Sequence, residues 1–316
     1  MKKPMLIKGI NLGGWLSQCS YDKKHMDTFI KDEDFDIIAS WGADHVRIPF
    51  DYNILQDNNG NFIEEGFRRL EKAVSNCRRC GLDTVLDLHK TAGFSFDYYS
   101  ESESGFFENT EYQQRFFRLW DKIAEIFGKY SDTVAFELLN EITDESFLKS
   151  WKRIAAECIS RIRKYAPDTI ILVGSYNNNA AETVQYLDAP ADENVIYNMH
   201  CYEPLKFTHQ GAYWTDAIVP SERIEYNNSG CSAEYFEKLF ASALEKSKSN
   251  NTRLYCGEYG VIDVVSPEET LKWYEDINSV FRKYNIGRCA WNYRQMDFGI
   301  SDSRLDGVRN QLIKYL

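Results

Sequence analysis

Short apolar runs alternate along the chain with longer segments in which apolar residues recur every three to four positions. The runs have the length and composition of buried strands, and the longer segments have the period of amphipathic helices. The predicted strands cover residues 5–11, 44–48, 83–89, 133–140, 169–173, 194–200, 253–258 and 286–291. The predicted helices lie near residues 32–41, 64–80, 110–130, 145–165, 178–187, 232–249, 267–284 and 305–315. Eight strands in strict alternation with eight helices predict an α/β fold of the (β/α)8 type, a TIM barrel.

Turn residues support this phasing. Gly42, Gly81 and Gly128 stand where a helix would end in a left-handed residue, and Pro167 follows the helix predicted to end near residue 165. No linker rich in Pro, Gly or Ser divides the 316 residues, of which 43% are hydrophobic. We therefore expect one barrel domain spanning residues 1–316.

Polar and aromatic side chains close most of the predicted strands. These residues are Arg47, His89, Asn140 with Glu141, His200 with Tyr202, Glu258 and Trp291. The carboxyl ends of barrel strands meet on one face, where active sites are built, so we expect these side chains to surround one cavity. The two-residue period of a strand also predicts neighbours that share a face and support each other. The predicted pairs are Asp87 with His89, His200 with Tyr202, and Cys256 with Glu258.

Two of the apolar runs end in a glutamate. One run closes with Asn140 and Glu141, and the other closes with Gly257 and Glu258. A charge at the end of a buried strand must lie at a sheet edge or in a pocket where it has a use. Two carboxyl groups brought to one end of a sheet are the equipment needed to cleave a glycosidic bond. The pattern therefore predicts that Glu141 and Glu258 form a catalytic pair.

Charge and aromatic content narrow the choice of substrate. The net charge of −11 argues against nucleic acids and anionic membranes, because those partners require clustered Lys and Arg. Aromatic residues make up 15% of the chain, and platforms for sugar rings are one use for them, with packing as the other. We expect a neutral carbohydrate substrate, a monomer, and neither a cofactor nor a metal.

The eight cysteines are scattered through a chain that is long enough to fold without disulfides, so we expect mostly free thiols. Cys77 and Cys80 form a CxxC at the end of a predicted helix, and we interpret it as a helical coincidence because no second pair accompanies it. The amino terminus has no apolar signal-peptide core, and no run is long enough to span a membrane. As the sequence stands we expect a soluble, cytoplasmic protein, or a secreted one if a leader was removed.

The chain contains Leu-Leu-Asn-Glu at 138–141, Gly-Glu-Tyr-Gly at 257–260, and His-Cys-Tyr between them at 200–202. In this combination the sequence resembles glycoside hydrolase family 5, the large cellulase family, over nearly its whole length. The matching segments are residues 8–15, 45–50, 86–89, 136–141, 200–202, 257–261 and 290–293. The first and last of these are most similar to compact clostridial endoglucanases that act on cellulose and mixed-linkage β-glucan. Lys90 departs from the second His or the Gly that is common in the family.

The resemblance implies a retaining endo-β-glucanase that forms a covalent glycosyl-enzyme intermediate. It implies that Glu141 is the general acid and then the base, and that Glu258 is the nucleophile. The resemblance also implies supporting roles. Arg47 and Tyr202 would donate to Glu258, and Asn140 would donate to the sugar 2-hydroxyl. His89 and His200 would bind hydroxyls or order the carboxylates, and Trp291 would form a floor for the sugar.

The remaining candidates lie at the first strand and in two loops. Asn11 and Trp15 follow the first strand, where they would contact the glycone. The loops that would wall a groove are residues 94–99, with four aromatic residues, and the segment carrying Phe207, His209 and Trp214.

Other functions remain open at this point. An exo-β-1,3-glucanase or a β-mannanase of the same family would share all of these residues. A metal-dependent barrel hydrolase could use His89, His200, Asp87 and Glu258, but its first strand usually carries His-x-His, and here it reads Gly9-Ile10-Asn11. A non-catalytic sugar-binding barrel would be expected to lack one of the two glutamates.

Overall fold

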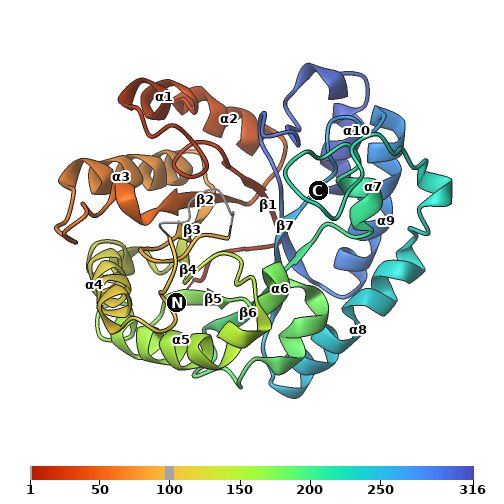
Figure 1. The fold of residues 1–316 in the computed structure, drawn as a ribbon. Coiled ribbons are helices and arrows are strands. Elements are labelled where there is room, and N and C mark those ends of the chain that lie inside the picture. The colour runs from red at the N-terminus through yellow and green to blue at the C-terminus, as the bar shows by residue number, and fades with distance from the viewer. Residues whose placement is uncertain (1, 97–102) are drawn as a thin grey trace.

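The computed structural model describes residues 2–96 and 103–316 (Figure 1). Eight parallel strands form a closed barrel in chain order, and β1 pairs with both β2 and β8. The strands are β1 (Lys8–Asn11), β2 (His45–Asp51), β3 (Asp83–Lys90), β4 (Val134–Glu137), β5 (Ile170–Val173), β6 (Val195–Cys201), β7 (Leu254–Tyr259) and β8 (Gly287–Ala290). The predicted barrel is confirmed, and each predicted strand overlaps an observed one.

Helices surround the barrel (Figure 1). The longer ones are α2 (Asp32–Ser40), α3 (Glu64–Arg79), α4 (Thr110–Phe127), α5 (Leu148–Ile162), α8 (Ala233–Ser249), α9 (Pro267–Lys283) and α10 (Arg309–Tyr315). The shorter ones are α1 (Lys23–Thr28), α6 (Tyr176–Asn179) and α7 (Leu205–Thr208). Most of the longer helices bury several apolar residues on one face, as α4 does with Phe117, Trp120 and Phe127.

Some predicted helices differ from the observed ones. The prediction of a helix over 178–187 is wrong: α6 ends at Asn179, and a 3₁₀ segment, Ala181–Tyr186, follows it. The break falls where Asn177, Asn178 and Asn179 all have positive φ angles. Near the carboxyl terminus, α10 begins only at Arg309, after a separate 3₁₀ turn at Ser303–Leu305.

Of the three glycines predicted as left-handed helix caps, two have the predicted conformation and one does not. Gly42 and Gly81 have φ angles of 76° and 72°, which confirms their predicted conformation. Gly128 is not such a cap, because it keeps a right-handed helical φ of −58°. Its reason for being glycine is contact: an added Cβ would approach the Ala166 Cβ to 2.7 Å.

Two apolar layers hold the barrel together. A small inner cluster, with Val85, Leu172 and Ile196 among its members, fills the amino-terminal part of the barrel. A much larger cluster packs the outer faces of the strands against the helices. Towards the carboxyl ends of the strands the interior becomes polar, with Arg47 and Glu137 fully buried there. The inner apolar layer is therefore the base on which a buried polar layer rests.

A β-bulge in β7 changes which residues face the interior. Met199 of β6 pairs with Cys256, whereas His200 pairs with Glu258, so Gly257 is an extra residue in β7. Cys256 consequently belongs to the outer apolar cluster, while Glu258 is hydrogen-bonded inside the barrel. The prediction that Cys256 and Glu258 share a face is wrong for this reason.

The cysteines occupy the states expected of thiols. All eight lie in the described part of the chain, and none forms a disulfide. Cys77 is buried within α3, and Cys80 is the residue at which that helix ends. Across residues 2–96 and 103–316, no helix has both the length and the apolar character needed to cross a membrane.

Gly81 provides a test of backbone strain in this fold. An added methyl group would meet nothing within 4 Å, so Gly81→Ala should destabilise through the positive φ angle alone. We expect a loss of about 1 kcal/mol in the free energy of unfolding, measured by urea titration. Gly307 also has open space around its Cβ position but no positive φ angle, so Gly307→Ala is the matched control. Equal effects from the two substitutions would contradict this explanation.

Candidate active site

A single buried guanidinium organises the polar layer of the barrel. Arg47 donates from Nε and Nη2 to the two carboxylate oxygens of Glu137, at 2.7 and 2.8 Å. Its Nη1 donates to Asn11 and Glu258, and its Nη2 donates to Asn140 as well. These contacts use all five N–H donors of an arginine. Burial by itself lowers the pKa of Arg47, but the nearby carboxylates outweigh that effect and raise the pKa well above its usual value.

Glu258 lies at the end of β7 and faces this guanidinium. Its Oε1 accepts from Arg47 at 2.7 Å, and its Oε2 accepts from the Tyr202 hydroxyl at 2.9 Å. Burial alone raises the pKa of Glu258, but the charges of His200, Arg47 and His89 and the Tyr202 hydrogen bond lower it below its usual value. This environment favours the ionised form of the Glu258 carboxylate.

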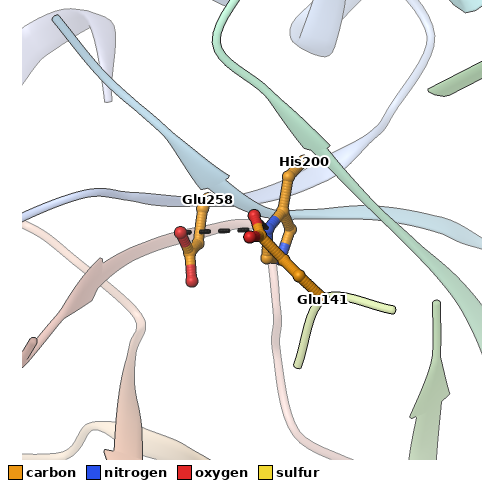
Figure 2. Close-up of side chains that lie close together, drawn as sticks. All are labelled: Glu141, His200 and Glu258. Atoms are coloured by element: carbon orange, nitrogen blue, oxygen red, sulfur yellow. Dashed lines mark hydrogen bonds and ion pairs between the residues drawn. The ribbon is translucent and has the colours of Figure 1, made fainter. Parts of the chain in front are cut away.

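Glu141 faces Glu258 from the turn that follows β4. The predicted strand over 133–140 ends earlier, at Glu137, so Asn140 and Glu141 are carried by the loop beyond it. The Nδ1 atom of His200 lies 2.8 Å from Glu141 Oε1 and 3.8 Å from Glu258 Oε2, so it is close to both carboxyl groups (Figure 2). Asn178 donates to the other oxygen of Glu141 at 2.8 Å.

The separation of the two carboxyl groups decides what they can do together. One oxygen of Glu141, one oxygen of Glu258 and the Nδ1 of His200 all lie within 4.8 Å of one another. Both carboxyl groups are largely buried, with 8% of Glu141 and 5% of Glu258 exposed. Such a spacing leaves room for one sugar carbon between them, but too little for a water held on the opposite face of a sugar.

His89 and Trp291 lie beside this pair. Nδ1 of His89 is 2.6 Å from Asp87 Oδ2, which confirms that these two residues of β3 share a face. The His89 ring stacks parallel to the Trp291 indole, with centroids 5.8 Å apart. Burial lowers the pKa of His89, but Asp87 and Glu258 reverse that effect, so the pKa lies above its usual value. Gly13 makes room for the indole, since a Cβ there would come within 2.4 Å of it.

Asn11 and Asn140 both accept from Arg47 through their side-chain oxygens. Asn11 also donates to the Gly257 carbonyl at 2.9 Å, so it ties β1 to the residue before Glu258. The Nδ2 of Asn140 has no hydrogen-bond partner among the described residues. A buried amide donor without a partner is costly, and a bound hydroxyl would satisfy it.

Three other aromatic residues that were predicted to line the site are buried in the core. Trp15 is buried against Phe35, and its indole N–H donates to the Met26 carbonyl, so it packs the barrel beneath the rim. Phe94 and Phe207 are buried in the apolar core, which is not the groove-wall role predicted for them.

Trp214 is half-buried in the segment that follows β6. It contacts the ring of His209, and the ring of His209 contacts that of Tyr202. Phe96 lies edge-on to His89. Residues 97–99, which completed the predicted aromatic loop, lie outside the described residues.

One group in the described chain combines His and acidic ligand atoms closely enough for a metal, and it consists of Glu141, His200 and Glu258 (Figure 2). His89 and Asp87, which the metal-hydrolase alternative requires, do not belong to it. Arg47 and Tyr202 already donate to the Glu258 oxygens, and a positively charged guanidinium beside a carboxylate opposes the binding of a second cation.

Sequence reasoning missed three residues of this network: Glu137, Asn178 and Asn198. Glu137 and Asn198 are both fully buried, and a hydrogen bond of 2.9 Å joins them. The available signal was the two-residue period, which puts Glu137 two positions from Ala135 and Asn198 two positions from His200 on inward-facing strand positions. Asn178 lies in a segment predicted as helix, so no pattern pointed to it.

Comparison with known proteins agrees with this geometry. A family model described as cellulase (glycosyl hydrolase family 5) matches residues 2–297. Cellodextrinase A of Ruminococcus flavefaciens is 58% identical over 288 residues, which cover 91% of this chain and 85% of that protein. Endoglucanase C of Acetivibrio thermocellus is 33% identical and covers 98% of this chain and 97% of its own.

A solved endoglucanase of Thermotoga maritima superposes with a TM-score of 0.81 at 26% identity, covering 98% of this chain and 97% of that one. The closed barrel, the facing glutamates and these relatives lead to one conclusion. The chain belongs to glycosyl hydrolase family 5, the cellulase family, and is a glycoside hydrolase.

Proposed function

We propose that this protein is a retaining β-glucanase that hydrolyses β-1,4-linked glucans, both soluble cello-oligosaccharides and mixed-linkage β-1,3-1,4-glucan, within the chain. Residues 1–316 act in this proposal as one catalytic domain and as a monomer. No metal or cofactor takes part. The finer assignment draws on relatives named cellodextrinase and endoglucanase.

The observation that carries the proposal is the position of Glu141 and Glu258, whose oxygens lie within 4.8 Å of each other on the same rim. Retaining enzymes place their carboxyl groups about 5 Å apart, whereas inverting enzymes need more room for a water. The surroundings of the two groups also differ. Glu258 receives donors from Arg47 and Tyr202, while Glu141 is paired with His200 and Asn178.

In the first step an oxygen of Glu258 attacks the anomeric carbon, and the bond from that carbon to the leaving oxygen breaks. Glu141 gives its proton to the leaving oxygen, so the departing sugar leaves as a neutral alcohol. The unpartnered Nδ2 of Asn140 would donate to the 2-hydroxyl of the reacting sugar, a bond that strengthens as positive charge develops.

In the second step water attacks the anomeric carbon and displaces Glu258, and Glu141 takes a proton from that water. His200 supports both steps because its Nδ1 lies close to both carboxyl groups. Burial lowers the pKa of His200, but Glu258 and Glu141 more than compensate, so the pKa lies above its usual value. A protonated His200 would stabilise the negative charge on whichever carboxylate is ionised.

Replacing the nucleophile should abolish hydrolysis. We expect Glu258→Ala to lower kcat on an aryl β-cellobioside by at least about 10⁴-fold, because no group remains to form the covalent intermediate. Thermal unfolding followed by circular dichroism should show that the variant still folds. Turnover near the wild-type rate in a folded variant would refute the role of Glu258.

The hydrogen bond from Tyr202 should set the acid limb of the pH profile. Glu258 must be ionised to attack, and the Tyr202 hydroxyl helps to lower its pKa. Tyr202→Phe removes that donor, so the pKa of Glu258 rises and the acid limb of kcat/KM should move to higher pH. Tyr197 lies on β6, the strand that Tyr202 follows, but its hydroxyl donates to the Asp188 carbonyl, so Tyr197→Phe is the matched control. An unmoved acid limb in Tyr202→Phe would contradict this assignment.

Product stereochemistry and substrate range test the finer proposal. Proton NMR should show the β-anomer as the first product released, because two inversions restore the configuration. Rates on barley β-glucan, carboxymethyl cellulose and cello-oligosaccharides should exceed those on laminarin and glucomannan. Glucomannan is included because the Thermotoga maritima protein has been solved with mannotriose as well as with cellobiose. An α-anomer as the first product would overturn the retaining mechanism. Laminarin as the best substrate would overturn the proposed linkage.

A further inference from the structure

Glu137 is a third buried carboxylate of the site, and the proposed reaction does not use it. It lies at the end of β4, faces the interior of the barrel and has no exposed surface. Its two oxygens accept from Nε and Nη2 of Arg47, and Oε1 also accepts from Asn198 at 2.9 Å. Burial this deep prevents contact with substrate, so any effect on catalysis must pass through its partners.

The first connection from Glu137 to Glu258 runs through Arg47. A bidentate pair fixes the plane of a guanidinium as well as its position. With Nε and Nη2 held on Glu137, Nη1 is the nitrogen that remains to face Glu258, at 2.7 Å, and Asn11, at 2.9 Å. Without the bidentate partner, the guanidinium could rotate and would no longer direct Nη1 at the nucleophile.

The second connection runs through Asn198 of β6. Its Nδ2 donates to Glu137, and its Oδ1 accepts from the backbone N–H of Gly257 at 2.9 Å. Gly257 is the extra residue of the β7 bulge and immediately precedes Glu258. Contact at this point is close, since a Cβ on Gly257 would lie 2.8 Å from Asn198 Oδ1. Glu137 thus reaches the side chain of Glu258 by one path and its backbone by the other.

We propose that Glu137 is a positioning residue that aims Glu258 at the anomeric carbon, by orienting Arg47 on one side and the Asn198–Gly257 contact on the other. This inference rests on the proposed role of Glu258 as nucleophile. A displacement of about 1 Å in an active site can cost about 100-fold in rate, so a residue that holds the nucleophile from two sides should affect kcat strongly.

Several charged and titratable groups face Glu258 or its partner Arg47, and they determine how the pH profile responds. They are Arg47 from β2, Asp87 and His89 from β3, Glu137 and Glu141 from β4 and the turn after it, and His200 and Tyr202 from β6 and its end. If Glu137 acted only through its negative charge, removing the charge would lower the pKa of Glu258. If Glu137 positions Arg47, its loss weakens the contact of Arg47 with Glu258 and raises that pKa.

The test uses Glu137→Gln, which keeps the size of the side chain and removes its charge. With an aryl β-cellobioside we expect kcat to fall about 10- to 100-fold with little change in KM, and the acid limb of kcat/KM to move to higher pH. An unchanged kcat, an unmoved acid limb or a shift of that limb to lower pH would each overturn the positioning role.

Two further variants separate positioning from general loss of stability. Asp192 forms a bidentate pair with Arg163 at the opposite end of the barrel, so Asp192→Asn is the matched control and should leave the pH profile unchanged. Asn198→Ala breaks only the second connection and should lower kcat less than Glu137→Gln does. If Glu137→Gln fails to fold, wild-type kcat in Asn198→Ala contradicts the proposal and a reduced kcat supports it.

A separate measurement distinguishes failure of this inference from failure of the proposed function. The wild-type protein is treated with a 2-deoxy-2-fluoro-β-cellobiosyl fluoride, which would trap the glycosyl-enzyme intermediate, and the labelled peptide is identified by mass spectrometry. Label on Glu258, together with a normal pH profile in Glu137→Gln, overturns only the role of Glu137. Label on another residue overturns the function on which this inference depends.

Discussion

The structure depends on one buried positive charge. Arg47 has no exposed surface, and the cost of burying a guanidinium is large unless every donor finds an acceptor and the charge is balanced. Asp87, Glu137 and Glu258 supply the balancing charge, while Asn11 and Asn140 accept its remaining hydrogen bonds. Because each of these residues comes from a different part of the barrel wall, satisfying Arg47 also fixes the relative positions of strands β1, β2, β3, β4 and β7. The same requirement that makes the fold specific therefore places Glu258, the proposed nucleophile.

The positive charge of Arg47 also explains how two chemically identical side chains, those of Glu141 and Glu258, can take different roles. Glu258 lies against Arg47, and its pKa is lowered by cationic neighbours although burial opposes this. Glu141 is bound instead by the His200 ring and by the Asn178 amide, and it receives no hydrogen bond from Arg47. Two carboxyl groups in unlike surroundings can divide the work of nucleophile and acid, whereas two in like surroundings would compete for one proton. The asymmetry comes from the barrel wall beneath them, not from the glutamates themselves.

The sequence predicted the rim of this site better than its interior. Residues such as Glu141, His200 and Glu258 interrupt apolar runs at strand ends, so their polarity stood out against the pattern. Glu137 and Asn198 lie in strands that are buried on both faces, where only the two-residue alternation marks an inward-facing polar residue, and a short strand shows that alternation over few positions. The bulge at Gly257 could not be predicted, because one inserted residue leaves no trace in a short apolar run and yet reverses the alternation. The helix predicted over 178–187 failed for a tertiary reason: the backbone N–H groups of Asn177 and Asn178 donate to the loop that carries Glu141.

Chain length of the substrate must be decided outside this fixed centre. On one side, Phe96 meets His89 with ring centroids 4.9 Å apart, and His89 stacks on Trp291. On the opposite side of the barrel, Tyr202, His209, Trp214 and Tyr213 contact one another in succession, and Tyr213 is 77% exposed. Burial lowers the pKa of His209 to about 4, so at neutral pH its ring is uncharged and serves as an aromatic surface. Both series of rings begin at residues of the polar layer and end in loops. Loops tolerate change that the Arg47 network does not, so substitution of these outer rings can alter contacts with a long substrate and leave the two glutamates in place.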